Sequence, residues 1–202
     1  WNETTSPDYQ PIIVRGYGFV VGLDGTGSRD VPPAVRAHMI QIMTRQGVGI
    51  AALGADGVSP EELLDSPDTA VVIVEGFVPP GAVGRTRTPP VASGRPAEVM
   101  PGTTFDVRVH ADPRTGTSSL EGGRLYTTDL HPGPLLAGSR QARVLAQASG
   151  PIFLNPYTDD AAASSGVMDL RNGRILNGGQ VTEDMPIKLT LMTPSYTRVR
   201  VI

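Results

Sequence analysis

The sequence predicts an α+β fold of several short, mostly antiparallel strands, one main amphipathic helix and long Gly/Pro-rich loops. The chain of 202 residues holds 24 glycines and 19 prolines, well above average usage, while aromatic residues make up only 5%. Short apolar runs recur between turn signals, and only one long segment has clear helical spacing. A chain of this length forms one domain that can bury a core.

The first strand is predicted from Ile12 to Leu23. Its large apolar residues fall on alternate positions, the period of a half-buried strand: Tyr17, Phe19, Val21 and Leu23. The other face carries Gly16, Gly18 and Gly22, and glycine within a strand often marks a bulge or a close backbone neighbour. Residues 1–11 are polar and are predicted to be a flexible lead-in to a single domain over 12–202.

Two helices are predicted after this strand. Apolar residues recur at helical spacing from Val35 to Met43, after Pro32-Pro33 and before Gly47. We therefore expect an amphipathic helix of about 13 residues that starts at the proline pair. A second, weaker helix is predicted over Pro60 to Asp65.

The rest of the chain is predicted to be strands, turns and one insertion. The β-branched run from Ala70 to Val74 indicates a buried strand. The segment from Gly81 to Pro101, rich in Pro, Gly, Arg and Thr, is expected to be an exposed loop. Shorter strands are expected at Phe105–Val109, Leu125–Leu130, Ala142–Ala148, Val167–Leu170 and Lys188–Met192. Turns are expected at Gly122-Gly123, His131-Pro132-Gly133, Asn172-Gly173 and Asn177-Gly178-Gly179, and Asn172-Gly173 is interpreted as a hairpin turn.

Charge and composition argue against several classes of partner. The net charge of −3 gives no bulk electrostatic reason to expect a nucleic acid or an anionic membrane as partner. No stretch approaches the roughly 18 apolar residues of a membrane-spanning helix, so no direct membrane insertion is expected. Cysteine is absent, which excludes disulfides and thiolate metal sites.

The glycine-rich stretch GYGFVVGLDGTGSRD, residues 16–30, raises the question of nucleotide binding. After Gly16 and Gly18 the third glycine of a dinucleotide fingerprint is displaced by one position. A phosphate-binding P-loop needs a lysine beside Ser or Thr, and the single lysine is Lys188, far downstream. Backbone N–H groups of residues 23–28 remain an alternative anion site, but a tight structural turn is favoured and no cofactor is predicted.

The side chains that could bind a metal or take part in catalysis do not form a recognisable metal-binding or catalytic motif. His38 has no His or acidic partner four residues away on its helix, His110 and Asp112 lie at a strand end, and His131 precedes a Pro-Gly turn. The adjacent carboxylates Glu61-Glu62 and Asp159-Asp160 are interpreted as solvated surface. No nucleophile motif is present. The residues predict no metal site, no catalytic residue and a non-enzymatic, structural protein.

Seven segments of the chain follow one family pattern in order. The first, GYGFVVGLDGTGSRD (residues 16–30), is similar to GYGLVVGLxGTGD, a signature near the mature N-terminus of the flagellar P-ring protein family. Six further segments follow in the family's order: AVRAHMIQIMTRQG (34–47), DTAVVIVEGFVPP (68–80), GTTFDVRVHA (102–111), SLEGGRLYTTDL (119–130), ARVLAQASG (142–150) and NGRILNGGQVTEDMP (172–186). Eight motif glycines, one tyrosine and one asparagine are candidate assembly residues: Gly16, Tyr17, Gly18, Gly22, Gly25, Gly27, Gly122, Gly123, Asn177 and Gly178.

The resemblance implies a structural subunit of the periplasmic ring around the distal rod of the flagellar basal body. Its implied partners are further copies of itself in a homo-oligomeric ring, the rod and L-ring proteins, peptidoglycan and a periplasmic chaperone. Strand edges at Val71–Val74 or Phe105–Val109 are possible joints between subunits, with core packing as the alternative. A second hypothesis is a non-flagellar cell-envelope binding module that uses the same fold.

The chain departs from the family pattern in two ways. The segment 81–101 is an insertion, and positions that are basic in the family hold Pro67, Ser118 and Glu121 here. Arginines of the insertion (Arg85, Arg87 and Arg95) are a possible substitute for the missing basic residues.

Overall fold

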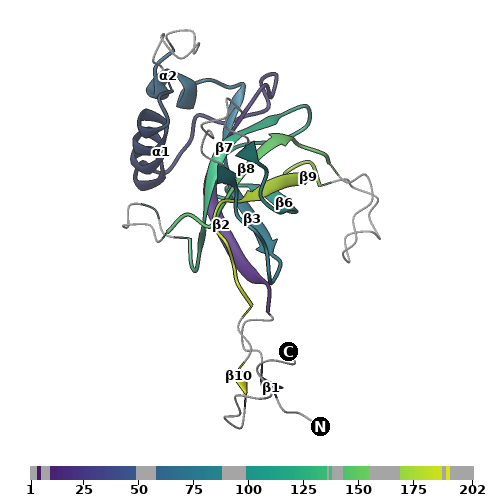
Figure 1. Cartoon of the computed structure of the whole chain (residues 1–202). Coiled ribbons are helices and arrows are strands. Elements are labelled where there is room, and N and C mark those ends of the chain that lie inside the picture. Colours follow the sequence, from purple (N-terminus) through teal and green to yellow (C-terminus); the bar gives the residue numbers. More distant parts are fainter. Residues whose placement is uncertain are drawn as a thin grey trace.

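A closed six-stranded barrel forms the body of the protein (Figure 1). The computed structural model describes residues 4–5, 10–48, 58–87, 99–135, 137, 143–154, 169–187 and 190–191. All neighbouring barrel strands are antiparallel, in the order β2-β3-β6-β9-β8-β7. Their bounds are β2 (Ile12–Val21), β3 (Thr69–Val78), β6 (Thr104–Ala111), β7 (Arg124–Pro132), β8 (Ala146–Pro151) and β9 (Asn172–Val181).

Two short strand pairs lie outside the barrel. Strand β1 (Thr4–Thr5) pairs with β10 (Thr190–Leu191), which joins segments from the two ends of the chain. Strand β4 (Thr86–Arg87) pairs with β5 (Val99–Met100) at the two sides of the insertion, whose residues 88–98 lie outside the described part. The flexibility of 1–11 and the exposure of the whole 81–101 loop stay predictions.

Alternation along β2 and β3 creates two apolar cores, one inside the barrel and one outside it. Val14 and Val20 point into the barrel interior. Tyr17 and Phe19 point outward and pack with residues of the first helix, Val35, Met39 and Met43. All ten residues of β3 pair with β2, and β3 is apolar on both faces, as the β-branched run predicts.

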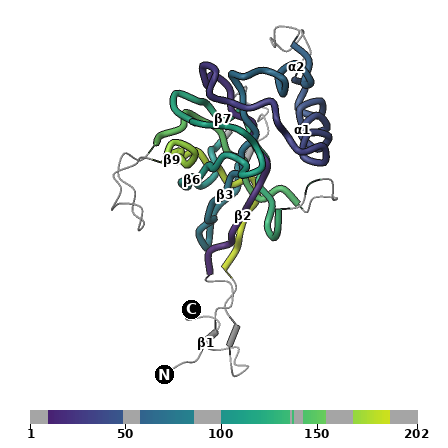
Figure 2. Tube along the Cα trace, turned by 180° about the vertical axis from the view of Figure 1, so that it is seen from behind, coloured from purple at the N-terminus to yellow at the C-terminus, as the bar shows by residue number. Residues whose placement is uncertain are grey.

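Both predicted helices are present, and both lie on the same side of the barrel (Figure 2). Helix α1 (Pro33–Arg45) begins directly after Pro32, and Gly47 follows its end with a φ of 77°. Helix α2 (Pro60–Leu64) begins with a capping box between Ser59 and Glu62. An ion pair of 2.8 Å from Arg36 to Asp65 joins the ends of the two helices.

The turns predicted at Asn172-Gly173 and at Asn177-Gly178-Gly179 are wrong, because both segments lie in a strand. Asn172 and Gly173 are the first residues of β9 and pair with β6, and neither has the positive φ that a primed hairpin turn requires. Asn177, Gly178 and Gly179 also lie within β9. The register with β6 shifts there and Asn177 has a φ of 52°, so the signal corresponds to a bulge inside a continuing strand.

Several strand boundaries also differ from the prediction. Strand β8 begins at Ala146 instead of Ala142, and Leu170 lies in a turn before β9, while Val167 and Met168 of the predicted strand lie outside the described residues. His131 and Pro132 belong to β7, and the chain turns only at Gly133. The strands around Val71–Val74 and Phe105–Val109 have no free edge, because each pairs on both sides within the closed barrel. Subunits therefore cannot join along those edges.

Neither helix in the described part of the chain is long and apolar enough to cross a membrane.

Candidate functional site: the glycine loop at the barrel rim

The glycine loop, residues 22–28, continues from β2 and is held between two other segments of the rim. The N–H groups of Leu23, Gly27 and Ser28 donate to the carbonyls of Asp68, Pro67 and Thr69. On the other side, Ser118 donates its N–H to the Thr26 carbonyl, and the Thr26 hydroxyl donates to the Ser119 carbonyl. The loop thus ties the start of β3 to the segment that precedes β7.

The glycines of this loop are required for two different reasons. A Cβ at Gly27 would lie 2.0 Å from the Thr69 carbonyl oxygen and 2.6 Å from that of Pro67, so only glycine fits. Gly22 and Gly25 have open space around them, but their φ values of 78° and 82° lie in the left-handed region that favours glycine. The loop is therefore the tight structural turn that the sequence analysis favoured.

The alternative anion site at residues 23–28 is not supported by the geometry. The Thr26, Gly27 and Ser28 N–H groups are bound by backbone carbonyls of the chain itself. The Gly25 N–H is bound by the Asp68 carboxylate at 2.8 Å. The Asp68 carboxylate already occupies this exposed donor, and its charge repels a second anion.

Four further motif glycines sit where strand β7 approaches β2. A Cβ at Gly16 would lie 2.3 Å from the Asp129 carbonyl oxygen, and one at Gly18 would press on Leu125 and Val74. The pairing of β2 with β7 changes register in this region, as expected for a bulge with close backbone contact. Gly122, with a φ of 71°, and Gly123 turn the chain into β7, and Gly123 packs under Leu23 of the glycine loop.

Asn177 and Gly178 are not near the glycine loop. They form the bulge of β9, where the Asn177 N–H donates to the Asp106 carboxylate at 2.8 Å and Gly178 packs on Ile175. The structure therefore brings Gly16, Gly18, Gly22, Gly25, Gly27, Gly122 and Gly123 to the seam and rim between β2 and β7, and it places Asn177 and Gly178 on another wall.

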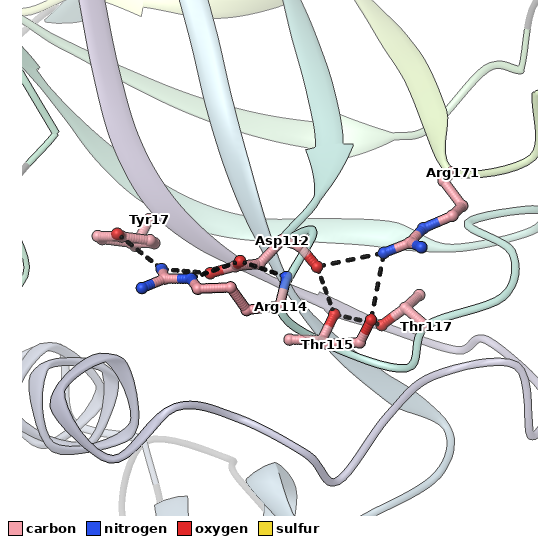
Figure 3. A network of polar contacts seen from close by, with 6 residues as sticks. All are labelled: Tyr17, Asp112, Arg114, Thr115, Thr117 and Arg171. Carbon is pink, nitrogen blue, oxygen red and sulfur yellow. Dashed lines mark hydrogen bonds and ion pairs between the residues drawn. The ribbon is translucent and has the colours of Figure 1, made fainter.

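A polar network beside the glycine loop joins β2 to the segment that follows β6 and to Arg171, just before β9 (Figure 3). The fully buried Asp112 accepts hydrogen bonds from the Arg114 side chain at 3.0 and 2.7 Å, and Arg114 donates onward to the Tyr17 hydroxyl at 3.2 Å. Arg171 donates to the carbonyls of Asp112 and Thr115. Tyr17, a motif residue, therefore helps to anchor the loop that follows β6.

The ionisation of Asp112 depends on its arginine partners. Burial raises the pKa of this carboxyl, but hydrogen bonds from the Arg114 side chain and backbone, and then the charges of Arg114 and Arg171, outweigh burial and hold the pKa below its usual value. Asp112 is therefore a structural anion bound within the chain. The Asp112 carboxylate also accepts the backbone N–H of Arg114 at 3.0 Å, which forms an Asx turn. The sequence Asp-Pro-Arg is compatible with such a turn, and it is the local signal by which this site could be predicted.

The histidines lie apart from any metal-ligand cluster: within the described ranges no group of three His, Cys, Asp or Glu side chains is placed to hold a metal ion. His38 is buried edge-to-face against Tyr17, with ring centroids 5.8 Å apart. His110 lies within β6, and the neighbouring Asp112 is bound by Arg114. Glu62 serves the capping box, and Asp159-Asp160 lie outside the described residues.

The three positions that the resemblance predicts to be basic, Pro67, Ser118 and Glu121, lie at or beside the glycine loop. Pro67 and Ser118 bind the loop from its two sides, and Glu121 lies in the turn before β7. Arg85 follows β3 at the opposite end of the barrel, where its N–H donates to the carbonyl of Val181. Arg85 therefore does not replace a basic residue at this rim.

The fold and the rim together define the class of protein. It is a small antiparallel β-barrel domain in which the glycine loop and the rim residues are hydrogen-bonded to one another. The family model described as flagellar P-ring protein matches residues 90–199. A flagellar P-ring protein of Gluconobacter oxydans is 31% identical over 90% of this chain and 42% of its own length. The corresponding proteins of Rhodospirillum rubrum and Caulobacter vibrioides are 30% and 27% identical over 93% and 92% of this chain, and 43% and 44% of theirs.

This chain belongs to the flagellar P-ring protein family. It spans less than half the length of the curated relatives it matches.

Proposed function

We propose that this chain forms the barrel part of a structural subunit of the flagellar P-ring. Copies assemble side by side in the periplasm into a ring that surrounds the distal rod as a bushing. The observation that carries the proposal is the similarity to flagellar P-ring proteins over 90% of the chain. The rod, the L-ring, peptidoglycan and a periplasmic chaperone are the proposed contacts of the assembled ring.

The rim geometry supports a mechanical role. The glycine loop and the Asp112–Arg114–Tyr17 network direct their hydrogen-bonding groups toward the chain itself, which fixes β2, the start of β3, the segment after β6 and the segment before β7 relative to one another. A bushing needs such a rigid wall, because it must keep its shape while another body turns inside it. The insertion between β3 and β6 leaves from the barrel end away from the glycine loop, so it extends a different surface of the subunit.

Cryo-electron tomography of flagellar motors tests this function. Cells that carry the gene, cells that lack it, and deleted cells complemented with the wild-type gene are compared. We expect the periplasmic ring around the rod to disappear on deletion, swimming to be lost, and both to return on complementation. Intact rings and normal swimming in deleted cells would overturn the proposal and leave the envelope-binding module as the explanation.

A further inference from the structure

Neighbouring strands β6 and β9 each carry one exposed arginine, Arg108 and Arg174, that has no partner among the described residues. Arg108 of β6 and Arg174 of β9 are directly opposite in the strand register, and both are exposed. In the described part of the chain neither guanidinium has a hydrogen bond or an ion pair. Like charges directly opposite on neighbouring strands are destabilising, so this placement weakens the isolated barrel.

Two acidic residues flank Arg108: Glu75 in the strand register with β3, and Asp106 along β6 itself. Glu75 of β3 is the register partner of Arg108, but its carboxylate is bound to Arg15 at 2.6 Å. Asp106, two residues before Arg108, accepts the Asn177 N–H of the β9 bulge. The arginine pair therefore keeps its positive charge toward solvent.

Two large apolar side chains lie on the same outward face. Phe153 bridges to Arg174 and is 56% exposed, and Leu176 follows Arg174 on the same side of β9 and is 63% exposed. We call Arg108, Phe153, Arg174 and Leu176 the β9 face. Aromatic residues and arginine are enriched at the centre of protein–protein interfaces, so Phe153 and the two arginines fit such a surface, and Leu176 extends its apolar area.

The opposite wall of the barrel carries acidic groups. In the strand order β9 is opposite β2, and the helices cover β2 and β3, so the β9 face and the helices point in opposite directions (Figures 1 and 2). Glu61 and Glu62 of α2 are exposed, and Val58, just before this helix, is 39% exposed. Arg36 on the same side is neutralised by Asp65.

We propose that the β9 face docks onto the α2 side of a second copy of this chain. Two complementary faces on opposite walls make a head-to-tail contact, which closes into a ring when the rotation between copies allows it. The contact places Arg108 and Arg174 beside Glu61 and Glu62 and covers Phe153 and Leu176. This inference rests on the proposed function, since it names the surface by which the ring subunits join.

Sedimentation equilibrium of the full chain tests the contact. We expect the wild type to self-associate in low salt and to dissociate as salt screens the charges. Arg174→Glu should weaken association about tenfold or more, while it creates an opposite-charge pair with Arg108 and so leaves the barrel at least as stable. Loss of association therefore cannot be assigned to misfolding. Arg85→Glu, the same charge change at the other end of the barrel, is the matched control and should associate like the wild type.

Mixing two variants tests the pairing itself. Arg174→Glu and Glu61→Arg should each associate poorly alone and associate together, because every contact between the two unlike chains restores an opposite-charge pair. A wild type that stays monomeric at high concentration in low salt, an Arg174→Glu variant that associates normally, or a mixture without recovery would overturn the proposal.

Tomography of cells that carry Arg174→Glu separates this inference from the proposed function. A gene-dependent ring that is unchanged by the substitution would refute the β9 face and leave the function standing. A ring that does not depend on the gene would refute the function, whatever the solution measurements show.

Discussion

At the level of single residues, Gly27 is required for lack of space and Gly22 for its left-handed backbone. Replacing each glycine by asparagine should therefore have different effects on stability. Gly27→Asn should lower the free energy of unfolding by about 3 kcal/mol, because its Cβ would overlap two backbone carbonyls that cannot move independently. Gly22→Asn should lower it by less than about 1 kcal/mol, because the site is open and asparagine tolerates left-handed backbone. Urea unfolding of both variants measures the difference, and equal losses would contradict this reading of the loop.

His38 makes stability depend on pH. Its pKa lies below the usual value because of burial first, and then because of the positive charges of His131 and Arg45. The folded state therefore binds this proton less readily than the unfolded state. The stabilising contribution is fully present above the unfolded pKa, about 6.5, and is lost as the pH falls through that value toward the folded pKa.

The measurement is urea unfolding at several pH values from 8 to 5. His38→Gln should remove part of the loss of stability on acidification, by at most about 1.4 kcal/mol per pH unit. The difference between wild type and variant isolates this residue from the other titrating groups. His131→Gln is the control, and it should reduce the slope less, since its charge is a smaller cause than burial. Parallel profiles for wild type and His38→Gln would contradict the linkage.

The contacts of individual residues at the rim could be predicted only where the interacting residues are close in sequence. The glycine spacing already excluded a nucleotide loop and favoured a turn, and the structure shows the turn. The bond from Arg114 to Tyr17 joins residues 97 positions apart, so no spacing in the sequence indicates it. In the sequence Asp112 is only a polar residue near His110 at a strand end, because its arginine partner becomes apparent only when the chain turns after β6.

At the level of secondary-structure elements, the bulge of β9 sets the register with β6. Asn177 has a φ of 52° and is paired through its N–H with Asp106. Asn177→Gly should preserve stability, whereas Asn177→Val should lose about 1–2 kcal/mol, because a β-branched residue is strained in left-handed backbone. Leu176→Val, at an exposed neighbouring position, is the control and should be close to neutral. Chemical denaturation measures all three, and a stable Asn177→Val would argue that the bulge can relax.

The elements with strong local signals were predicted well, and β9 shows why others were not. Strand β2 and helices α1 and α2 follow from alternation, helical spacing and proline placement. In β9 both Asn-Gly pairs indicated turns, but Gly173 is needed for space, since a Cβ there would lie 2.4 Å from Ile152. The sequence shows that glycine is required at such a position. It does not show whether the requirement is a turn or a close neighbour.

At the level of the whole molecule, closure of the barrel cannot be predicted from any single segment of the sequence. The α+β expectation included the antiparallel strands and the few helices, but the ring order β2-β3-β6-β9-β8-β7 depends on pairings between distant segments. Closure removes every free edge of the six strands, and this corrects the expectation of edge-to-edge joints. Subunits must then meet through side chains on the outer walls, which is the kind of contact proposed for the β9 face.

Hydrogen exchange of the full chain tests closure and locates its weakest seam. Strand β2 pairs with β3 along its whole length, whereas β8 pairs with β9 only from Ala146 to Ala148 and through the bridge at Phe153. Local opening between β8 and β9 should therefore be easier than between β2 and β3, and amides that bond across the β8–β9 seam should exchange faster than those between β2 and β3. Assembly through outer walls should leave protection of the β2–β3 amides unchanged. Rapid exchange along β2 or β3 in the free chain, with new protection there on assembly, would instead show that the barrel opens and that subunits join by strand pairing.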